Sequence, residues 1–100
     1  LRNADLTEVN LSGANLGGAN LSQTDLTRVG LKKTDLNGAN LNGANLTGAD
    51  LREADLSGAI NITCDQITST IIDKDTKLPA YINLTRSKNS TSECKETTRR

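Results

Sequence analysis

The stretch ADLREADLSGA, residues 49–59, repeats one five-residue phrase: alanine, an acidic residue, leucine and two further residues. Extended in both directions, the phrase places a leucine at every fifth position from Leu1 to Leu56. Amphipathic helices space apolar residues three and four apart, and half-buried strands space them two apart. A period of five fits neither, so each five-residue unit, or pentad, is predicted to form one short side of a coil.

The two positions before each leucine are also restricted. A small or compact residue stands two before every leucine from Leu6 to Leu56, and Asp or Asn stands immediately before it, with Gly30 as the exception. In rows of twenty residues, Gly18, Gly38 and Gly58 fall in one file, meaning one position of successive rows. This file indicates a twenty-residue coil with a corner where glycine supplies a positive φ.

This pattern, A-(D/N)-L-x-x, resembles the motif of the pentapeptide-repeat family, and residues 1–60 match it throughout. The resemblance implies an all-β solenoid, a right-handed quadrilateral parallel β-helix of about three coils with a short C-terminal capping α-helix. Such stacked units bury a core that no single unit buries alone. The leucines expected in that core are Leu6, Leu11, Leu16, Leu21, Leu26, Leu31, Leu36, Leu41, Leu46, Leu51 and Leu56.

After residue 60 the period is lost, and residues 61–84 are predicted to form the cap. Thr63 and Gln66 have the spacing of a capping box, which marks the first turn of a helix. Ile67 and Ile71 share one face of that helix. We therefore expect a helix over about 64–73 that lies across the last coil with this face inward.

Residues 85–100 consist mainly of Ser, Thr, Lys, Glu and Arg and are predicted to be a disordered polar tail. Cys64 and Cys94 allow one disulfide, which would tie this tail to the helix. Because Cys64 lies on the expected inward face, a buried free thiol is the favoured interpretation.

Composition excludes several classes of function. Lys plus Arg and Asp plus Glu are both 12, so no net charge attracts nucleic acid or an acidic membrane. No apolar run approaches the roughly 18 residues of a membrane span. Two distant cysteines without any histidine make no metal site, and no cofactor is expected. Since Leu1 is already in phase and no Met precedes it, we expect the chain to be part of a longer protein.

Two stacked pairs of carboxylates are the candidates for catalysis. In a twenty-residue coil Asp5 lies over Asp25, and Asp35 over Asp55, at separations that resemble the carboxylate pairs of glycosidases. The Asp/Asn position belongs to the repeat itself, however, and no basic residue clearly converges on either pair. A structural role is therefore favoured, and no catalytic residue is assigned.

A basic cluster is the candidate partner surface. Lys32 is expected over Arg52 in one outward file, with Lys33 beside it over Glu53. Like charges at the distance between coils are mildly unfavourable. Lys32, Lys33 and Arg52, called the basic wall below, are therefore a candidate site for an acidic partner, the alternative being a solvated wall.

The sequence is thus expected to encode a non-enzymatic structural or protein–protein interaction module, the C-terminal part of a larger repeat protein. The first coil is expected to stack on another domain, on more coils or on a second copy. Neither a membrane nor direct nucleic acid is an expected partner, and the protein partner is not identified.

Two alternatives come from repeat proteins of related architecture. One branch of the family mimics DNA and binds a topoisomerase, but residues 1–60 carry five basic and seven acidic groups, a weak net charge for such mimicry. Some parallel β-helices cleave polysaccharides with wall aspartates. The resemblance also implies a cyanobacterial or plastid lineage, in cytoplasm or thylakoid lumen, and no residue decides between these compartments.

Overall fold

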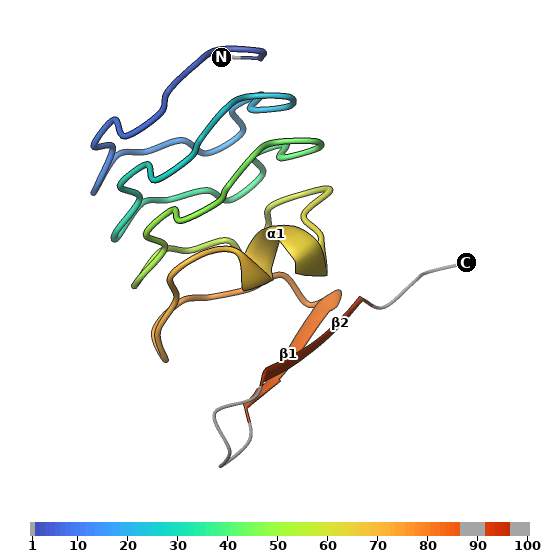
Figure 1. Ribbon diagram of the computed structural model, residues 1–100. Helices are drawn as coiled ribbons and strands as arrows, with labels where there is room; N and C mark the ends of the chain where they lie inside the picture. The colour runs from blue at the N-terminus through green and yellow to red at the C-terminus, as the bar shows by residue number, and fades with distance from the viewer. Residues whose placement is uncertain (1, 87–91, 97–100) are drawn as a thin grey trace.

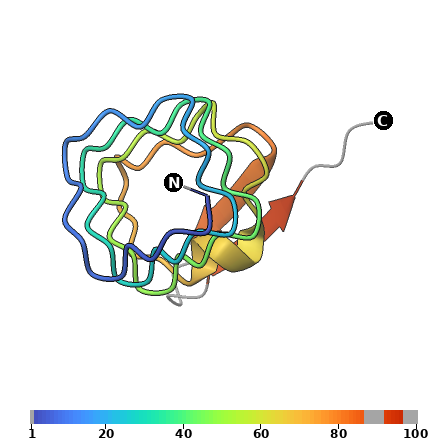
Figure 2. The same ribbon diagram turned by 90° about the horizontal axis from the view of Figure 1, so that it is seen from above.

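In a computed structural model the described residues are 2–86 and 92–96. The elements in chain order are α1 (Cys64–Thr68), β1 (Ile82–Arg86) and β2 (Ser92–Glu96). Residues 2–60, which precede α1, form a stack of loops joined by isolated parallel bridges (Figure 1). Seen along the stack, these loops lie over one another around a common centre (Figure 2).

Within residues 2–60 the bridges join residues that are twenty positions apart. The Asp/Asn position of each pentad pairs with the same position of the next coil, from Asp5–Asp25 to Asn40–Ile60. In the first bridge the N–H of Asp25 donates to the carbonyl of Ala4 (2.9 Å), and the N–H of Leu6 donates to the carbonyl of Asp25 (2.8 Å). The twenty-residue register indicated by the glycine file is therefore the register of the ladder.

Leucine and the residue two before it form the core. The fully enclosed leucines are no more than 2% exposed and are Leu21, Leu26, Leu31, Leu36, Leu41, Leu46, Leu51 and Leu56. Leu6, Leu11 and Leu16 are only partly buried, because among the described residues no further coil stacks on the first one. Each enclosed leucine contributes about 1.5–3 kcal/mol, so the inner coils carry most of the apolar stabilisation.

Each pentad ends in a tight turn that the backbone closes. The N–H of the small residue donates to the leucine carbonyl three positions earlier, as in Val9 to Leu6 (3.0 Å). The residue just before the donor has a positive φ in every pentad described except that of Gly58, whether or not it is glycine, for example 54° at Arg28 and 61° at Lys33. This is the geometry of a type II turn.

Gly58 departs from the expectation for its file. Gly18 and Gly38 have φ values of 72° and 78°, as predicted, but the φ of Gly58 lies outside the positive region, so the prediction is wrong there. The reason is a side-chain acceptor. The N–H of Gly58 donates to Oδ1 of Asn37 (2.7 Å), and the carbonyl of Gly58 accepts the N–H of Gly38 (2.9 Å).

The start of α1 agrees with the capping box. The N–H of Gln66 donates to Oγ1 of Thr63 (3.2 Å), and the N–H of Thr63 donates to Oε1 of Gln66 (2.7 Å). Ile67 is buried, as expected. The helix ends at Thr68, however, so the expected end near residue 73 is wrong. It ends early because the chain returns to the ladder two residues after its C-cap.

That return explains a second correction, at Ile71. The N–H of Ile71 donates to the carbonyl of Ala49 (2.8 Å), and its carbonyl accepts the N–H of Leu51 (2.8 Å). Ile71 thereby occupies the outward Asp/Asn position and is 50% exposed instead of packing in the core. Lys77 forms the next parallel bridge, to Asp55. The ladder therefore continues past the last pentad, although the sequence period does not.

The C-terminal strands pair as an antiparallel hairpin with Leu84 opposite Cys94. Cys64 and Cys94 form a disulfide with a Cα–Cα distance of 5.6 Å, so the expected free thiol is wrong. The expected disorder is also wrong for residues 85–86 and for β2, because strand pairing and the disulfide hold them. Residues 87–91 and 97–100 of that tail lie outside the described residues.

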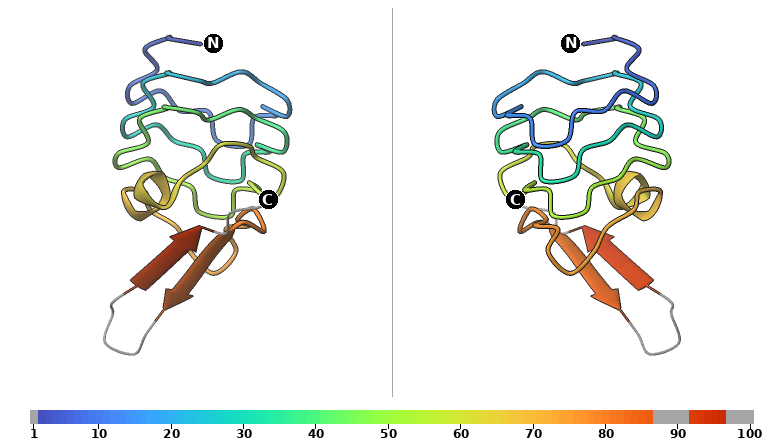
Figure 3. Two further views of the ribbon diagram at one scale, coloured as in Figure 1. Left: turned by 90° about the vertical axis from the view of Figure 1, so that its right-hand side faces the viewer. Right: turned by 90° about the vertical axis from the view of Figure 1, so that its left-hand side faces the viewer.

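The hairpin and α1 lie toward the end of the stack that is opposite the N-terminus (Figure 3). Leu78, Tyr81 and Cys94 pack against the buried core of the coils. Of the helices in residues 2–86 and 92–96, none has the length and apolarity that crossing a membrane requires.

Candidate partner-binding wall

The Asp or Asn side chain of each pentad is engaged in its own turn. Its Oδ1 accepts the N–H of the residue just after the leucine, here called the corner N–H, as in Asp5 with Thr7 (3.0 Å) and Asn10 with Ser12 (3.0 Å). This contact, an Asx turn, satisfies a donor that the bridge ladder leaves free. It recurs at Asn15, Asn20, Asp25, Asp35, Asn40, Asn45, Asp50 and Asp55.

The carboxylates considered for catalysis are engaged in these turns. The hydroxyl of Thr27 donates to Oδ1 of Asp25 (2.6 Å), and this bond with the Thr27 N–H lowers the pKa of Asp25. The hydroxyl and N–H of Thr7 lower the pKa of Asp5 in the same way. Carboxylates held ionised by their own backbone are poorly suited to general acid catalysis near neutral pH. The carboxylates of Asp5 and Asp25 thus have a structural role in their turns.

The second stacked pair is engaged similarly. Oδ1 of Asp35 accepts the corner N–H of Asn37 (3.0 Å). Oδ1 of Asp55 accepts both the hydroxyl (2.6 Å) and the N–H (3.0 Å) of Ser57, and these bonds lower the pKa of Asp55. Asp35 and Asp55 form a parallel bridge, as their twenty-residue separation predicts. In both stacked pairs the carboxylates are therefore bonded within their own Asx turns.

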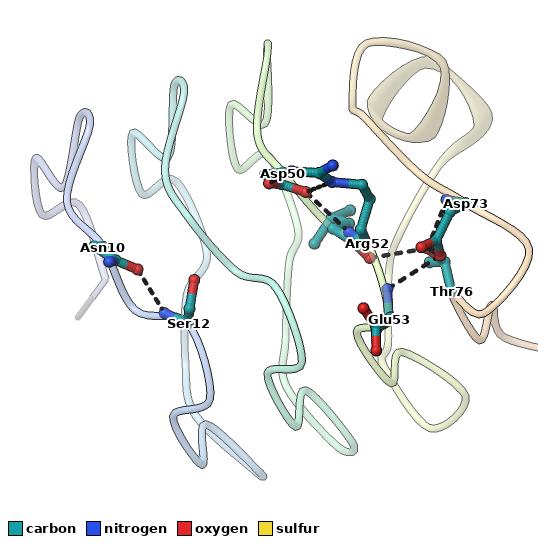
Figure 4. A network of polar contacts seen from close by, with 8 residues as sticks. Asn10, Ser12, Asp50, Arg52, Glu53, Asp73 and Thr76 are labelled. Atoms are coloured by element: carbon teal, nitrogen blue, oxygen red, sulfur yellow. Dashed lines mark hydrogen bonds and ion pairs between the residues drawn. The ribbon is translucent and has the colours of Figure 1, made fainter.

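Arg52 of the basic wall forms an ion pair within its own corner. Its Nε donates to Oδ1 of Asp50 (2.9 Å) and its Nη2 to Oδ2 of Asp50 (2.7 Å), a bidentate contact (Figure 4). The guanidinium hydrogen bonds lower the pKa of Asp50. Arg52 therefore contributes less unpaired positive charge to the basic wall than a lysine without a partner would, because Asp50 pairs with it.

Lys32 and Lys33 are placed on the same wall by the ladder. The carbonyl of Lys32 accepts the N–H of Gly13 (2.8 Å) from the coil before, and the N–H of Lys33 donates to the carbonyl of Arg52 (3.0 Å) in the coil after. Neither ammonium group forms an ion pair with any residue that the structure describes. The free positive charge of the basic wall is therefore carried by these two lysines.

Two further pairs test the register of the charged files. Glu8 and Arg28, twenty residues apart, form an ion pair of 2.9 Å between Oε2 and Nε. Lys33 and Glu53, which have the same separation, form none in the part of the chain that the structure describes. Of these two cross-coil pairs of opposite charge, only Glu8 and Arg28 therefore form an ion pair among the described residues.

Sequence reasoning missed the role of Asp73, below the basic wall. Its Oδ1 accepts the N–H of Glu53 (3.1 Å) from the coil before (Figure 4). It also accepts the N–H of Asp75 (3.0 Å) in its own turn. Thr76 donates its hydroxyl to the carbonyl of Leu51 (2.9 Å). The spacing of Asp73 and Asp75 is that of an Asx turn, which is the signal that was available. No cluster suited to a metal ion occurs among the side chains described.

The family model for pentapeptide repeats matches residues 4–43 and 24–60, with eight copies of the repeat. The chain belongs to the pentapeptide-repeat family. A comparison of this pentapeptide-repeat chain with curated protein sequences found no significant match.

Several solved pentapeptide-repeat structures are similar to the chain. The protein alr5209 from Nostoc PCC 7120 is 29% identical with a TM-score of 0.61, and the match covers 82% of this chain and 75% of that one. Rfr23 from Cyanothece 51142 is 35% identical with a TM-score of 0.45, over 78% and 56% of the two chains. HetL from Nostoc sp. PCC 7120, described as involved in heterocyst differentiation regulation, is 34% identical with a TM-score of 0.48, over 80% and 38%.

Proposed function

We propose that this pentapeptide-repeat chain is a non-enzymatic interaction module that binds an acidic protein partner through its basic wall. Its repeats would form a right-handed quadrilateral β-helix of about three coils, with α1 as part of the cap at one end. The twenty-residue bridge register supports this architecture. Gln66 supports the capping role, because its Nε2 donates to the carbonyls of Leu41 (2.8 Å) and Ala44 (2.9 Å) in the last coil.

The observation that carries the proposed function is the pairing of charges on the basic wall. Asp50 is neutralised by Arg52, whereas Lys32 and Lys33 have no ion pair among the described residues. The ladder fixes the backbone of both lysines, so a partner meets their charges at defined positions. Complementary charge on a partner accelerates association and excludes partners of the wrong sign.

The first coil supports placing the chain at the C-terminal end of a larger repeat protein. Val9 is 38% exposed, and the leucines of this coil are only partly buried. The backbone N–H groups of Asp5 and Asn10 donate to no described residue, whereas their counterparts Asp25 and Gly30 pair with the coil before. A further coil, another domain or a second copy would cover this edge.

The test reverses the two free charges. Cross-linking in the native source followed by mass spectrometry identifies the bound protein, and its affinity for the purified chain is then measured. We expect Lys32→Glu with Lys33→Glu to weaken binding at least about tenfold, which corresponds to about 1.4 kcal/mol. Both side chains are at least partly exposed, so the melting temperature should change little.

Lys74→Glu with Lys77→Glu is the matched control, because it makes the same change of net charge on exposed residues of the C-terminal segment. We expect it to leave the affinity within about twofold. Equal loss in the two double variants would reduce the effect to net charge, and unchanged affinity in the first would remove the basic wall from the interaction.

A further inference from the structure

Two positions of the repeat lack the Asp or Asn that accepts a corner N–H: Gly30 and Ile60. At Ile60 another segment replaces the missing acceptor. The corner N–H there belongs to Ile62 and donates to the hydroxyl of Tyr81 (3.2 Å), which itself donates to the carbonyl of Ala59 (2.7 Å). The fold thus supplies an oxygen from outside the pentad when the pentad has none.

At Gly30 no such replacement occurs within residues 2–86 and 92–96. The corner N–H belongs to Lys32, and none of the described residues accepts it. A backbone donor without a partner is satisfied by solvent or by a ligand, since leaving it unbonded costs free energy. The corner N–H of Lys32 is therefore a donor that its own pentad leaves to solvent or to a ligand.

A second donor faces the same space. A Cβ built on Gly30 would lie 3.4 Å from Oγ of Ser12, so the Ser12 hydroxyl borders the volume that an Asp or Asn side chain would enter. The hydroxyls of Thr7 and Ser22 donate to their own Asx oxygens, but that of Ser12 donates to no described residue. Figure 4 accordingly shows one dashed line at Ser12, from its N–H to Asn10.

The charges around this corner favour an anion. Lys32 carries the corner N–H itself, and Lys33 follows it in the chain. Asp50, which bridges to Gly30 from the next coil, would repel an anion if it were unpaired. Arg52 neutralises it through two hydrogen bonds. The atom nearest to the Cβ position is Oδ1 of Asn10, at 3.0 Å, and it already accepts the N–H of Ser12.

We propose that the Gly30 corner is a carboxylate-binding site for an Asp or Glu side chain of the protein partner. One carboxylate oxygen would take the place of the missing Asx oxygen and accept the N–H of Lys32 and the hydroxyl of Ser12. The ammonium groups of Lys32 and Lys33 would balance its charge. This proposal rests on the proposed function, since it names the point of the basic wall that the partner occupies.

The test follows the Lys32 amide by ¹⁵N NMR while the intact chain is titrated with a hexaglutamate peptide. We expect a saturable downfield shift of the Lys32 amide proton, larger than that of any other corner N–H. Hexaglutamine at the same concentration should produce no such shift. Inorganic phosphate is a third arm, and a shift as large as that with hexaglutamate would assign the corner to free anions and overturn the proposal.

Gly30→Asn supplies the Oδ1 acceptor found at this position in other pentads, and this oxygen should accept the N–H of Lys32. We expect at least tenfold weaker binding of hexaglutamate and a Lys32 amide that is already shifted downfield before titration. Asn occupies this position in other pentads, such as those of Asn10 and Asn45, so the variant should fold, and a melting curve verifies this. Gly30→Ala adds the Cβ without an oxygen and should keep more than a third of the affinity. An equal loss of hexaglutamate affinity in both variants would contradict the proposal that the carboxylate replaces the missing Asx oxygen.

The two proposals fail in different ways. If Lys32→Glu with Lys33→Glu weakens binding of the native partner but Gly30→Asn does not, the interaction at the basic wall stands and the carboxylate site is wrong. If the Lys32 amide titrates with hexaglutamate but charge reversal leaves the native partner bound, the corner binds carboxylates and the proposed function is wrong.

Discussion

The coils of residues 2–60 and the segment of residues 61–82 continue one ladder with two different kinds of polar contact. In the coils the corner N–H groups, except that of Lys32, are bonded to a side chain two residues away, as Ser57 is to Asp55. In the later segment some of these bonds span long distances in sequence, from Ile62 to Tyr81 and from Gln66 to Leu41, although Asp75 and Asp73 still form a local Asx turn. The comparison shows that local repetition maintains the backbone arrangement in the coils, whereas individual long-range contacts are added to it in the later segment.

Breaking the disulfide is expected to separate the two regions most strongly. Cys64 and Cys94 are 30 residues apart, and closing a loop of that size contributes about 3–4 kcal/mol by chain entropy. Reduction should therefore remove hydrogen-exchange protection from the amides of β1 and β2, while amides of the inner coils such as Leu36 keep theirs. Cys64→Ser with Cys94→Ser should reproduce the result without reductant. Equal loss of protection throughout the chain would show that the two regions unfold as one unit.

Removing one long-range acceptor is expected to have an intermediate effect. Tyr81→Phe leaves the N–H of Ile62 and the carbonyl of Ala59 without the hydroxyl, which should cost about 1–3 kcal/mol in the free energy of unfolding. Ile60→Asn should recover part of this loss, because it gives the corner the local acceptor that the coils use. Urea unfolding of the two single variants and the double variant measures the coupling. Strictly additive changes would show that the hydroxyl does not substitute for an Asx oxygen.

The pH dependence of the coils is expected to be the smallest difference. Hydrogen bonds from Thr27 lower the pKa of Asp25 in the folded protein. Its contribution to stability is therefore complete above the unfolded-state pKa of about 3.9 and is lost as the pH falls through the lowered folded-state value. Asp25→Asn keeps the Oδ1 acceptor but not the charge, so it should reduce the fall in melting temperature between pH 7 and about pH 3.

A matched variant places a carboxylate one coil further along the same file. Asn45 accepts the hydroxyl of Thr47 (2.7 Å), as Asp25 accepts that of Thr27 (2.6 Å). Asn45→Asp should therefore make the melting temperature more sensitive to acid. If both variants have the sensitivity of the unaltered chain, the turn hydrogen bonds do not contribute to acid stability.

Much of the coil region was predictable because its contacts repeat. Leu36 is buried, and Asp5 bridges Asp25, because equivalent positions of the pentads occupy equivalent places in the stack. Twelve leucines at a spacing of five make this equivalence visible in the sequence. The ion pair of Arg52 was missed because comparing files relates residues twenty apart, whereas its partner Asp50 is two residues away. Local and cross-coil contacts compete for the same side chain, and the twenty-residue register alone does not predict which of them forms.

The C-terminal segment was predictable only at its start. The capping box of Thr63 and Gln66 is a local signal, and it correctly marked where α1 begins. The end of α1 depends on Ile71 meeting the backbone of Ala49 and Leu51, which no local signal of residues 69–73 reveals. The disulfide was judged from one helix face, yet it depends on where β2 lies. Each miss concerns a contact with a distant part of the chain.

The twenty-residue register also determines which changes of chain length the surface pattern tolerates. An insertion of twenty residues adds one full coil, so every later side chain stays on the same side of the stack and moves only along its axis. An insertion of five residues also preserves the alternation of buried and exposed positions, but it shifts every later side chain to the neighbouring side. Insertions of four pentads would therefore lengthen the protein without changing its faces, whereas a gain or loss of one pentad would redistribute the side chains among them.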